Sequence, residues 1–116
     1  MQTATRTQTH DVLVVDLPEK LIMANSQAQA DAVLRRVDQG HRRVVFNLKQ
    51  VKFIDSSGLA VLVAALKKLR PLNGKVALAC PGPNVLSLIE LTRLHEIFEI
   101  FSDLETAVGD LSAQQD

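Results

Sequence analysis

Apolar residues fall into short runs separated by polar or turn-forming residues, and five of these segments have the pattern of β-strands. Residues 44–48 and 75–79 are apolar almost throughout, which is typical of parallel strands buried on both faces. The opening segment is rich in β-branched residues but poor in apolar ones, which predicts an exposed strand paired with the next in a hairpin. The five predicted strands are residues 3–9, 12–17, 44–48, 75–79 and 96–101.

Four further segments carry apolar residues at helical spacing. In the first, Ser26 and Gln29 match a capping box, and Gly40 supplies a stop. Ser102 and Glu105 match a second capping box that opens the last helix. The predicted helices begin near residues 26, 58, 83 and 102 and end near residues 40, 69, 92 and 111.

Strands that alternate with helices predict an α/β fold, because right-handed crossovers place the strands parallel in one sheet. The expected order is ββαβαβαβα: a mostly parallel sheet of four to five strands, an N-terminal antiparallel strand, and helices packed on the sheet. A chain of 116 residues with 47% apolar content can build one core. We therefore expect a single domain over residues 1–116, with residues 1–2 and 112–116 frayed.

Composition argues against several classes of partner. Thirteen basic and thirteen acidic residues cancel, and the basic residues form no block longer than the pairs Arg35-Arg36, Arg42-Arg43 and Lys67-Lys68, so no nucleic-acid partner is expected. The longest apolar run, residues 59–66, is far shorter than the roughly 18 residues of a membrane span, so no membrane insertion is expected. The single Cys80 fits a buried thiol in a reducing compartment, which predicts a cytoplasmic protein.

The most informative segment is residues 53–59, where a short apolar stretch ends at Asp55-Ser56-Ser57-Gly58 and a helical pattern begins. Asp55 or Ser56 caps the helix in the simplest interpretation. A catalytic serine is disfavoured, because the GxSxG pattern is absent and the three histidines are distant in sequence. In the third interpretation a hydroxyl is phosphorylated, which adds a charge of about −1.5 to −2 at the helix start, beside Asp55. These residues alone leave the cap and the phosphorylation site open.

The helix that follows is apolar nearly all round at its start. Leu59, Leu62, Val63, Leu66 and Leu69 fall on the predicted core side. The opposite side carries Ala60, Val61, Ala64 and Ala65, together with Lys67 and Lys68. This second side is either a docking face for a partner or an ordinary surface, because alanine is a good helix former that tolerates exposure.

The chain resembles the STAS domain family, and within it the stand-alone anti-sigma factor antagonists of bacteria. The resemblance covers essentially the whole chain. It is carried by the run Phe53-Ile54-Asp55-Ser56-Ser57-Gly58-Leu59, which follows the strand at residues 44–48 about midway along the sequence. The run Asn73-Gly74-Lys75-Val76 and the apolar pattern over residues 88–101 support it.

The resemblance implies a signalling protein that is not an enzyme and needs no cofactor or metal. In that family the unphosphorylated antagonist binds an anti-sigma factor, which is also a serine kinase, and a PP2C-type phosphatase reverses the phosphorylation. The acceptor maps onto Ser56, less favourably Ser57, with Asp55 as an orienting or metal-proximal neighbour and Gly58 allowing close backbone approach. Partner contacts are expected at Ser57, Leu59, Ala60, Val61, Ala64 and Lys68, on a monomer or weak dimer.

One loop departs from the family pattern. Glu19-Lys20-Leu21-Ile22 stands where many antagonists carry a Gly-Glu-Leu-Asp-like loop, so Glu19 replaces the glycine and Ile22 replaces the acidic side chain. Two other functions therefore stay open. One is a non-phosphorylated STAS subunit of an ABC-type lipid transport complex, and the other is an anion- or nucleotide-sensing module that uses the N-terminus of the second helix.

Overall fold

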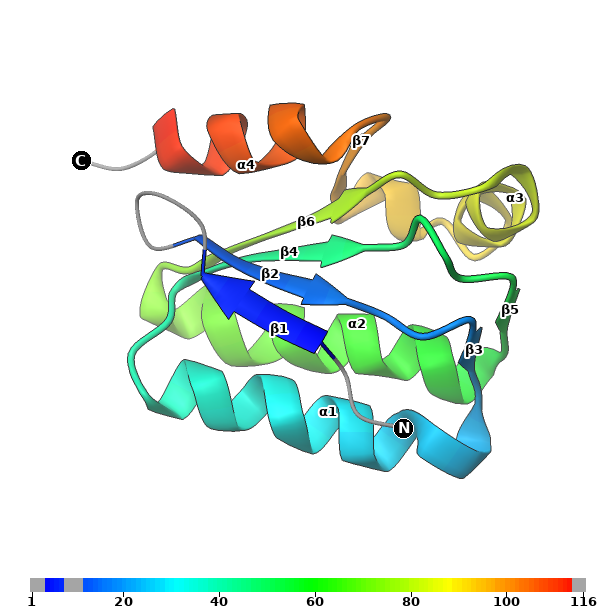
Figure 1. Cartoon of the computed structure of the whole chain (residues 1–116), viewed down its shortest axis with the longest axis horizontal. Helices are drawn as coiled ribbons and strands as arrows, with labels where there is room; N and C mark the ends of the chain where they lie inside the picture. Colours follow the sequence, from blue (N-terminus) through cyan, green and yellow to red (C-terminus); the bar gives the residue numbers. More distant parts are fainter. Residues whose placement is uncertain (1–3, 8–11, 114–116) are drawn as a thin grey trace.

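The computed structural model describes residues 4–7 and 12–113, and a five-stranded sheet lies at its centre (Figure 1). Its strands are β1 (Ala4–Thr7), β2 (Val12–Asp16), β4 (Arg43–Asn47), β6 (Lys75–Ala79) and β7 (Glu99–Phe101), side by side in that order. The pairs β2–β4, β4–β6 and β6–β7 are parallel, whereas β1–β2 is antiparallel. The α/β fold with an N-terminal antiparallel strand is therefore confirmed; the turn expected between the first two strands lies outside the described residues.

Helices cover both faces of the sheet (Figure 1). They are α1 (Met23–Asp38), α2 (Ser56–Leu69), α3 (Pro83–Leu91) and α4 (Leu104–Ala113). α1 and α2 lie side by side on one face, and α4 lies on the other. None of the helices in the described ranges has the length and apolar content to cross a membrane.

Alternate side chains of the central strands enter two separate cores, as expected for strands with both faces buried. On β4, Val44 and Phe46 face the larger core, which also holds buried residues of α1, α2 and α3, whereas Val45 faces the smaller one. On β6, Ala77 and Ala79 face the smaller core, which contains Ala107 and Leu111 of α4. Two of the buried sheet residues beneath α4 are therefore alanines, whereas the core beneath α1 and α2 contains Phe46 and many leucines.

α1 begins three residues before the capping box predicted at Ser26, and that prediction is wrong. The side-chain oxygen of Asn25 accepts the backbone N–H of Ile22 at 3.0 Å. The hydroxyl of Ser26 donates within the first turn, and Gln29 is buried with an exposure of 1%. The helix starts earlier because Asn25, together with Asp55 from another part of the chain, satisfies the N–H groups around its first turn.

The predictions near the C-terminus also need correction. The predicted strand at residues 96–101 is shortened to β7 because residues Leu94–Glu96 form a 3-10 helix after Arg93, whose φ is 62°. At α4 the cap is Asp103 instead of Ser102: the Asp103 carboxylate accepts the backbone N–H of Thr106 at 3.2 Å. Residues 112 and 113, expected to fray, belong to α4, and residues 1–2 and 114–116 lie outside the described ranges.

A second, two-stranded sheet was not predicted. β3 (Lys20–Leu21) pairs in parallel with β5 (Phe53–Ile54). The carbonyl oxygen of Glu19 accepts backbone N–H groups from residues 52 and 53, at 2.8 and 3.1 Å. This pairing brings the segment before α1 against the segment before α2. The first of these segments contains the loop Glu19-Lys20-Leu21-Ile22 discussed above.

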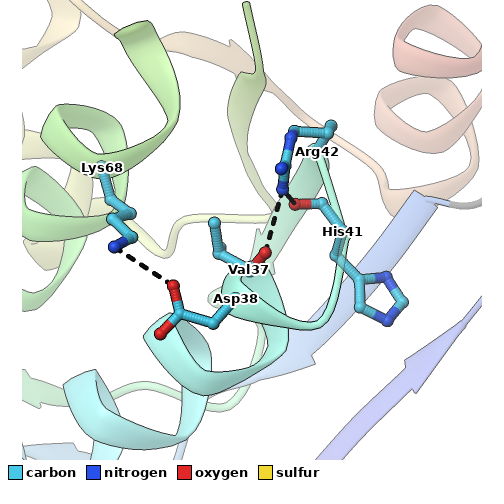
Figure 2. Close-up of polar contacts among 5 residues, drawn as sticks. All are labelled: Val37, Asp38, His41, Arg42 and Lys68. Atoms are coloured by element: carbon cyan, nitrogen blue, oxygen red, sulfur yellow. Dashed lines mark hydrogen bonds and ion pairs between the residues drawn. The ribbon is translucent and has the colours of Figure 1, made fainter. Parts of the chain in front are cut away.

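Polar contacts join the C-terminal ends of α1 and α2 (Figure 2). Nζ of Lys68 lies 3.1 Å from Oδ1 of Asp38. Arg42 donates from Nη1 to the carbonyl oxygens of Val37 at 2.9 Å and His41 at 3.0 Å, and so closes the end of α1. An exposed ion pair contributes only about 0–1 kcal/mol, so the apolar contact between the helices holds this end together.

Candidate functional site

The carboxylate of Asp55 joins the N-termini of two helices. Its Oδ1 accepts the backbone N–H of Gly58 at 2.9 Å, which caps α2. Its Oδ2 accepts the backbone N–H of Met23, the first residue of α1, at 3.0 Å. The backbone N–H of Asp55 donates to the carbonyl oxygen of Leu21 in β3 at 3.3 Å. One acidic side chain thus fixes the turn before α2 against the turn before α1.

These contacts favour the charged form of the carboxylate. The backbone N–H of Gly58, and then that of Met23, lower the pKa of Asp55 from its ordinary value, while partial desolvation opposes them. Both helix N-termini also carry partial positive charge, which favours an anion there. The sequence allowed either Asp55 or Ser56 as the cap of α2, and the structure shows that the cap is Asp55.

Ser56 and Ser57 are the first two residues of α2, but their environments differ. Ser56 is exposed, whereas Ser57 is half-buried on the side that faces α1. Within the described ranges neither hydroxyl takes part in a side-chain hydrogen bond, because Asp55 already caps the helix. The Ser56 hydroxyl is therefore available at the surface.

Two shallow grooves run along α2, one on each side of a ridge formed by Ala60 and Ala64. The groove between α1 and α2 has a volume of about 330 Å³ and includes Ser57. The groove between α2 and the segment after α3 has a volume of about 440 Å³ and includes Ser56, Leu59 and Leu94. The structure therefore brings both serines and most of the predicted contact residues together on one largely apolar surface.

Three of the predicted partner contacts differ from expectation: Val61 and Leu59 are buried, and Lys68 lies outside both grooves. Val61, expected on the outer side of the helix, has an exposure of only 3%, because α1 packs against that side of α2 and leaves Val61 at the floor of the groove. Ala65, also expected outside, is 1% exposed. Lys68 lies at the far end of α2 from Ser56 and pairs with Asp38. Leu59 is 8% exposed and contributes only an edge to the second groove.

Sequence analysis missed two exposed apolar side chains close to Asp55. Met23, whose backbone N–H binds Asp55, is 74% exposed. Phe53 is 57% exposed, and Nζ of Lys20 lies 5.8 Å from the centre of its ring. The sequence pattern places Phe53 in a short apolar stretch, and its exposure shows that the side chain faces outward. Both residues add exposed apolar side chains near the turn that Asp55 fixes.

Comparisons with known proteins agree with this arrangement. The model of the STAS domain matches residues 3–107. BtrV of Bordetella bronchiseptica, named as a candidate anti-sigma factor antagonist, is 30% identical over 98 residues, which cover 84% of each chain. The anti-sigma F factor antagonist of Paenibacillus polymyxa is 30% identical over 103 residues, or 86% of each chain. The crystal structure of an anti-sigma factor antagonist from Mycobacterium paratuberculosis has a TM-score of 0.85 at 26% identity, covering 95% of this chain and 92% of the other.

Gly58 tests how tightly the turn is packed. A Cβ atom at this position would overlap the carbonyl oxygen of Leu21 and lie 2.7 Å from Cγ1 of Ile54. We expect Gly58→Ala to lower the free energy of unfolding by about 1–3 kcal/mol, as overpacking does. Gly109→Ala is the matched control: its Cβ meets nothing within 4 Å, and alanine in α4 should stabilise by about 1 kcal/mol or less. Urea unfolding measures both, and equal effects of the two substitutions would contradict the packing described.

The lowered pKa of Asp55 predicts a pH dependence of stability. A carboxylate with a depressed folded-state pKa stabilises the fold fully above its unfolded value, about 3.9, and the stabilisation is lost as pH falls through the folded-state pKa. The difference in unfolding free energy between wild type and Asp55→Asn should therefore be largest near neutral pH and shrink below pH 4. Urea midpoints of both proteins over this range measure it; a difference that stays constant in acid would be the contrary result.

Proposed function

The chain belongs to the STAS domain family, and we propose that it is an anti-sigma factor antagonist whose binding to its partner is switched by phosphorylation of Ser56. The general role is supported by two relatives that bear this name and match over at least 84% of both chains. The observation that carries the switch is the exposure of Ser56 at the edge of the groove between α2 and the segment after α3.

The surface around Ser56 suits a protein partner. Ala60 and Ala64 form a ridge of short side chains, and a shallow apolar groove lies on each side of it. A partner helix or loop can therefore approach the backbone of α2 closely. Met23 and Phe53 are further exposed apolar side chains near Asp55. Exposed apolar surface of this kind marks interaction sites on small proteins.

Ser56 is a better acceptor than Ser57 on geometric grounds. The Ser56 hydroxyl is exposed and can enter the active site of a kinase, whereas Ser57 is half-buried at the groove between α1 and α2. A phosphate on Ser57 would also have to fit beside the α1 helix. The proposal therefore keeps Ser56 as the acceptor and gives Ser57 a contact role.

A phosphate on Ser56 would oppose docking through both charge and hydration. It adds a charge of about −1.5 to −2 next to Asp55, whose carboxylate already accepts the N–H groups of Gly58 and Met23. The negative charge of Asp55 already offsets part of the positive potential at the two helix N-termini. That potential therefore stabilises a phosphate on Ser56 less than it would without Asp55. A partner covering this apolar surface would have to desolvate the phosphate, which weakens the complex.

The partners follow from this mechanism. The unphosphorylated chain would bind an anti-sigma factor that is also the serine kinase, and a PP2C-type phosphatase would remove the phosphate. Because a sigma factor acts on transcription inside the bacterial cell, the proposal places this cycle in the cytoplasm. Asp55 acts in the proposal mainly by fixing the turn, since each carboxylate oxygen already accepts a backbone N–H.

The acceptor can be identified by intact-mass and fragment mass spectrometry after incubation with the cognate anti-sigma factor kinase and ATP. Wild type and Ser57→Ala are expected to gain one phosphate, and Ser56→Ala none. Ser102→Ala is the matched control, because Ser102 is also exposed and lies just before a helix. Phosphate uptake by Ser56→Ala, or no uptake by wild type, would contradict the proposal.

A further inference from the structure

A cavity distinct from the two grooves lies at the opposite end of α2 from Ser56. Its volume is about 630 Å³, within the range of about 300–1,000 Å³ that is usual for small-molecule sites. It is formed where the 3-10 helix Arg70–Leu72 follows α2, where β4 and β6 begin, and where the chain enters β7. With a rise of 1.5 Å per residue, the 14 residues of α2 separate it from Ser56 by about 20 Å.

Positive charge is concentrated at this end of the molecule. Residues 35–43 and 67–75 contain eight of the 13 lysines and arginines, but only Asp38 among the 13 acidic residues. The fold brings the two segments together: the backbone N–H of Lys75 donates to the carbonyl oxygen of Arg42 at 2.8 Å, and Lys68 pairs with Asp38. Although the net charge of the chain is zero, this end of the molecule is strongly basic.

Some of these cations already have structural roles. Arg42 donates to two carbonyl oxygens at the end of α1, and Lys68 pairs with Asp38 (Figure 2). Arg35 and Lys67 lie in the last turns of α1 and α2, where basic residues complement the helix dipole. These residues need no ligand to explain them.

Of the three cations that line the cavity, Arg43 and Lys75 differ from these, because they begin strands and no helix dipole accounts for them. The third, Arg70, is the C-cap of α2. Within the described part of the chain none of the three makes an ion pair, and Nε of Arg43 is buried without a hydrogen-bond acceptor. Cations that line one cavity and are not neutralised by acidic partners favour an anionic ligand there.

We propose that this cavity binds a small organic phosphate monoester. Arg43, Arg70 and Lys75 would hold the phosphate, because cations that converge in a cavity form charge-assisted hydrogen bonds to phosphate oxygens. Glu99 also lines the cavity, so the lining carries a net charge of +2, which matches a monoester with a charge near −2.

The rest of the cavity determines the kind of ester. Ile97, which is 42% exposed, and Leu66 provide an apolar wall for a ring or hydrocarbon group on the ester. The concave shape favours a small molecule over a flat membrane or an extended polyanion. The site does not involve Ser56, so Ser56→Ala is expected to bind as wild type does.

Phenyl phosphate is the probe, followed by amide chemical shifts in ¹H–¹⁵N spectra of the full chain. We expect saturable shifts at Asn73, Gly74 and Val76, and weaker binding of inorganic phosphate and of phenol, which each supply only half of the ligand. Arg70→Gln/Lys75→Gln replaces two exposed cations and should raise the dissociation constant about tenfold or more. Lys49→Gln/Lys52→Gln removes the same charge from another exposed surface and should leave it unchanged.

Three results would overturn the inference. The first is the absence of saturable shifts around residues 73–76 through the millimolar range. The second is equal loss of binding in the two double variants, which would indicate a response to net charge alone. The third is binding of the basic end to phosphatidylglycerol vesicles, lost in Arg70→Gln/Lys75→Gln, without binding of phenyl phosphate; that result would assign the surface to a membrane.

Discussion

The carboxylate of Asp55 bridges the first turns of α1 and α2, and the surface around Ser56 depends on that bridge. The two accepting oxygens, 2.9 Å from the Gly58 nitrogen and 3.0 Å from the Met23 nitrogen, fix both helix starts relative to each other. The small β3–β5 sheet pairs the segments that precede α1 and α2. Gly58 lies so close to Leu21 and Ile54 of this sheet that there is no room for a side chain. Ser56 is therefore presented on a rigid turn, and a partner meets a preformed surface.

The two ends of α2 have opposite character. The N-terminal end presents the Ser56 hydroxyl beside an apolar groove, where added negative charge would be poorly compensated. The C-terminal end has three cations around a cavity, where a negative charge would be stabilised. Because about 20 Å of helix separates them, the two ends can bind different ligands at the same time.

Local patterns in the sequence predicted the order of strands and helices, the antiparallel first strand and a cap at Asp55 or Ser56. They failed where a contact joins distant residues. The start of α1 was misplaced because the Met23 N–H is satisfied by Asp55, 32 residues away. Val61 was assigned to the outer side because helical periodicity shows one buried side, whereas α2 packs against both the sheet and α1. The basic end likewise forms from pairs that are scattered along the sequence.

The phosphorylation switch is tested by the affinity of the chain for its cognate anti-sigma factor, measured by calorimetry before and after complete phosphorylation of Ser56. Switching a complex from 99% to 1% bound requires about 5.5 kcal/mol, or about 10⁴-fold in affinity, more than a helix-dipole effect supplies. We expect phosphorylation to lower the affinity by at least about 100-fold, because uncompensated charge at an apolar interface costs several kcal/mol. An affinity unchanged by phosphorylation would contradict this expectation.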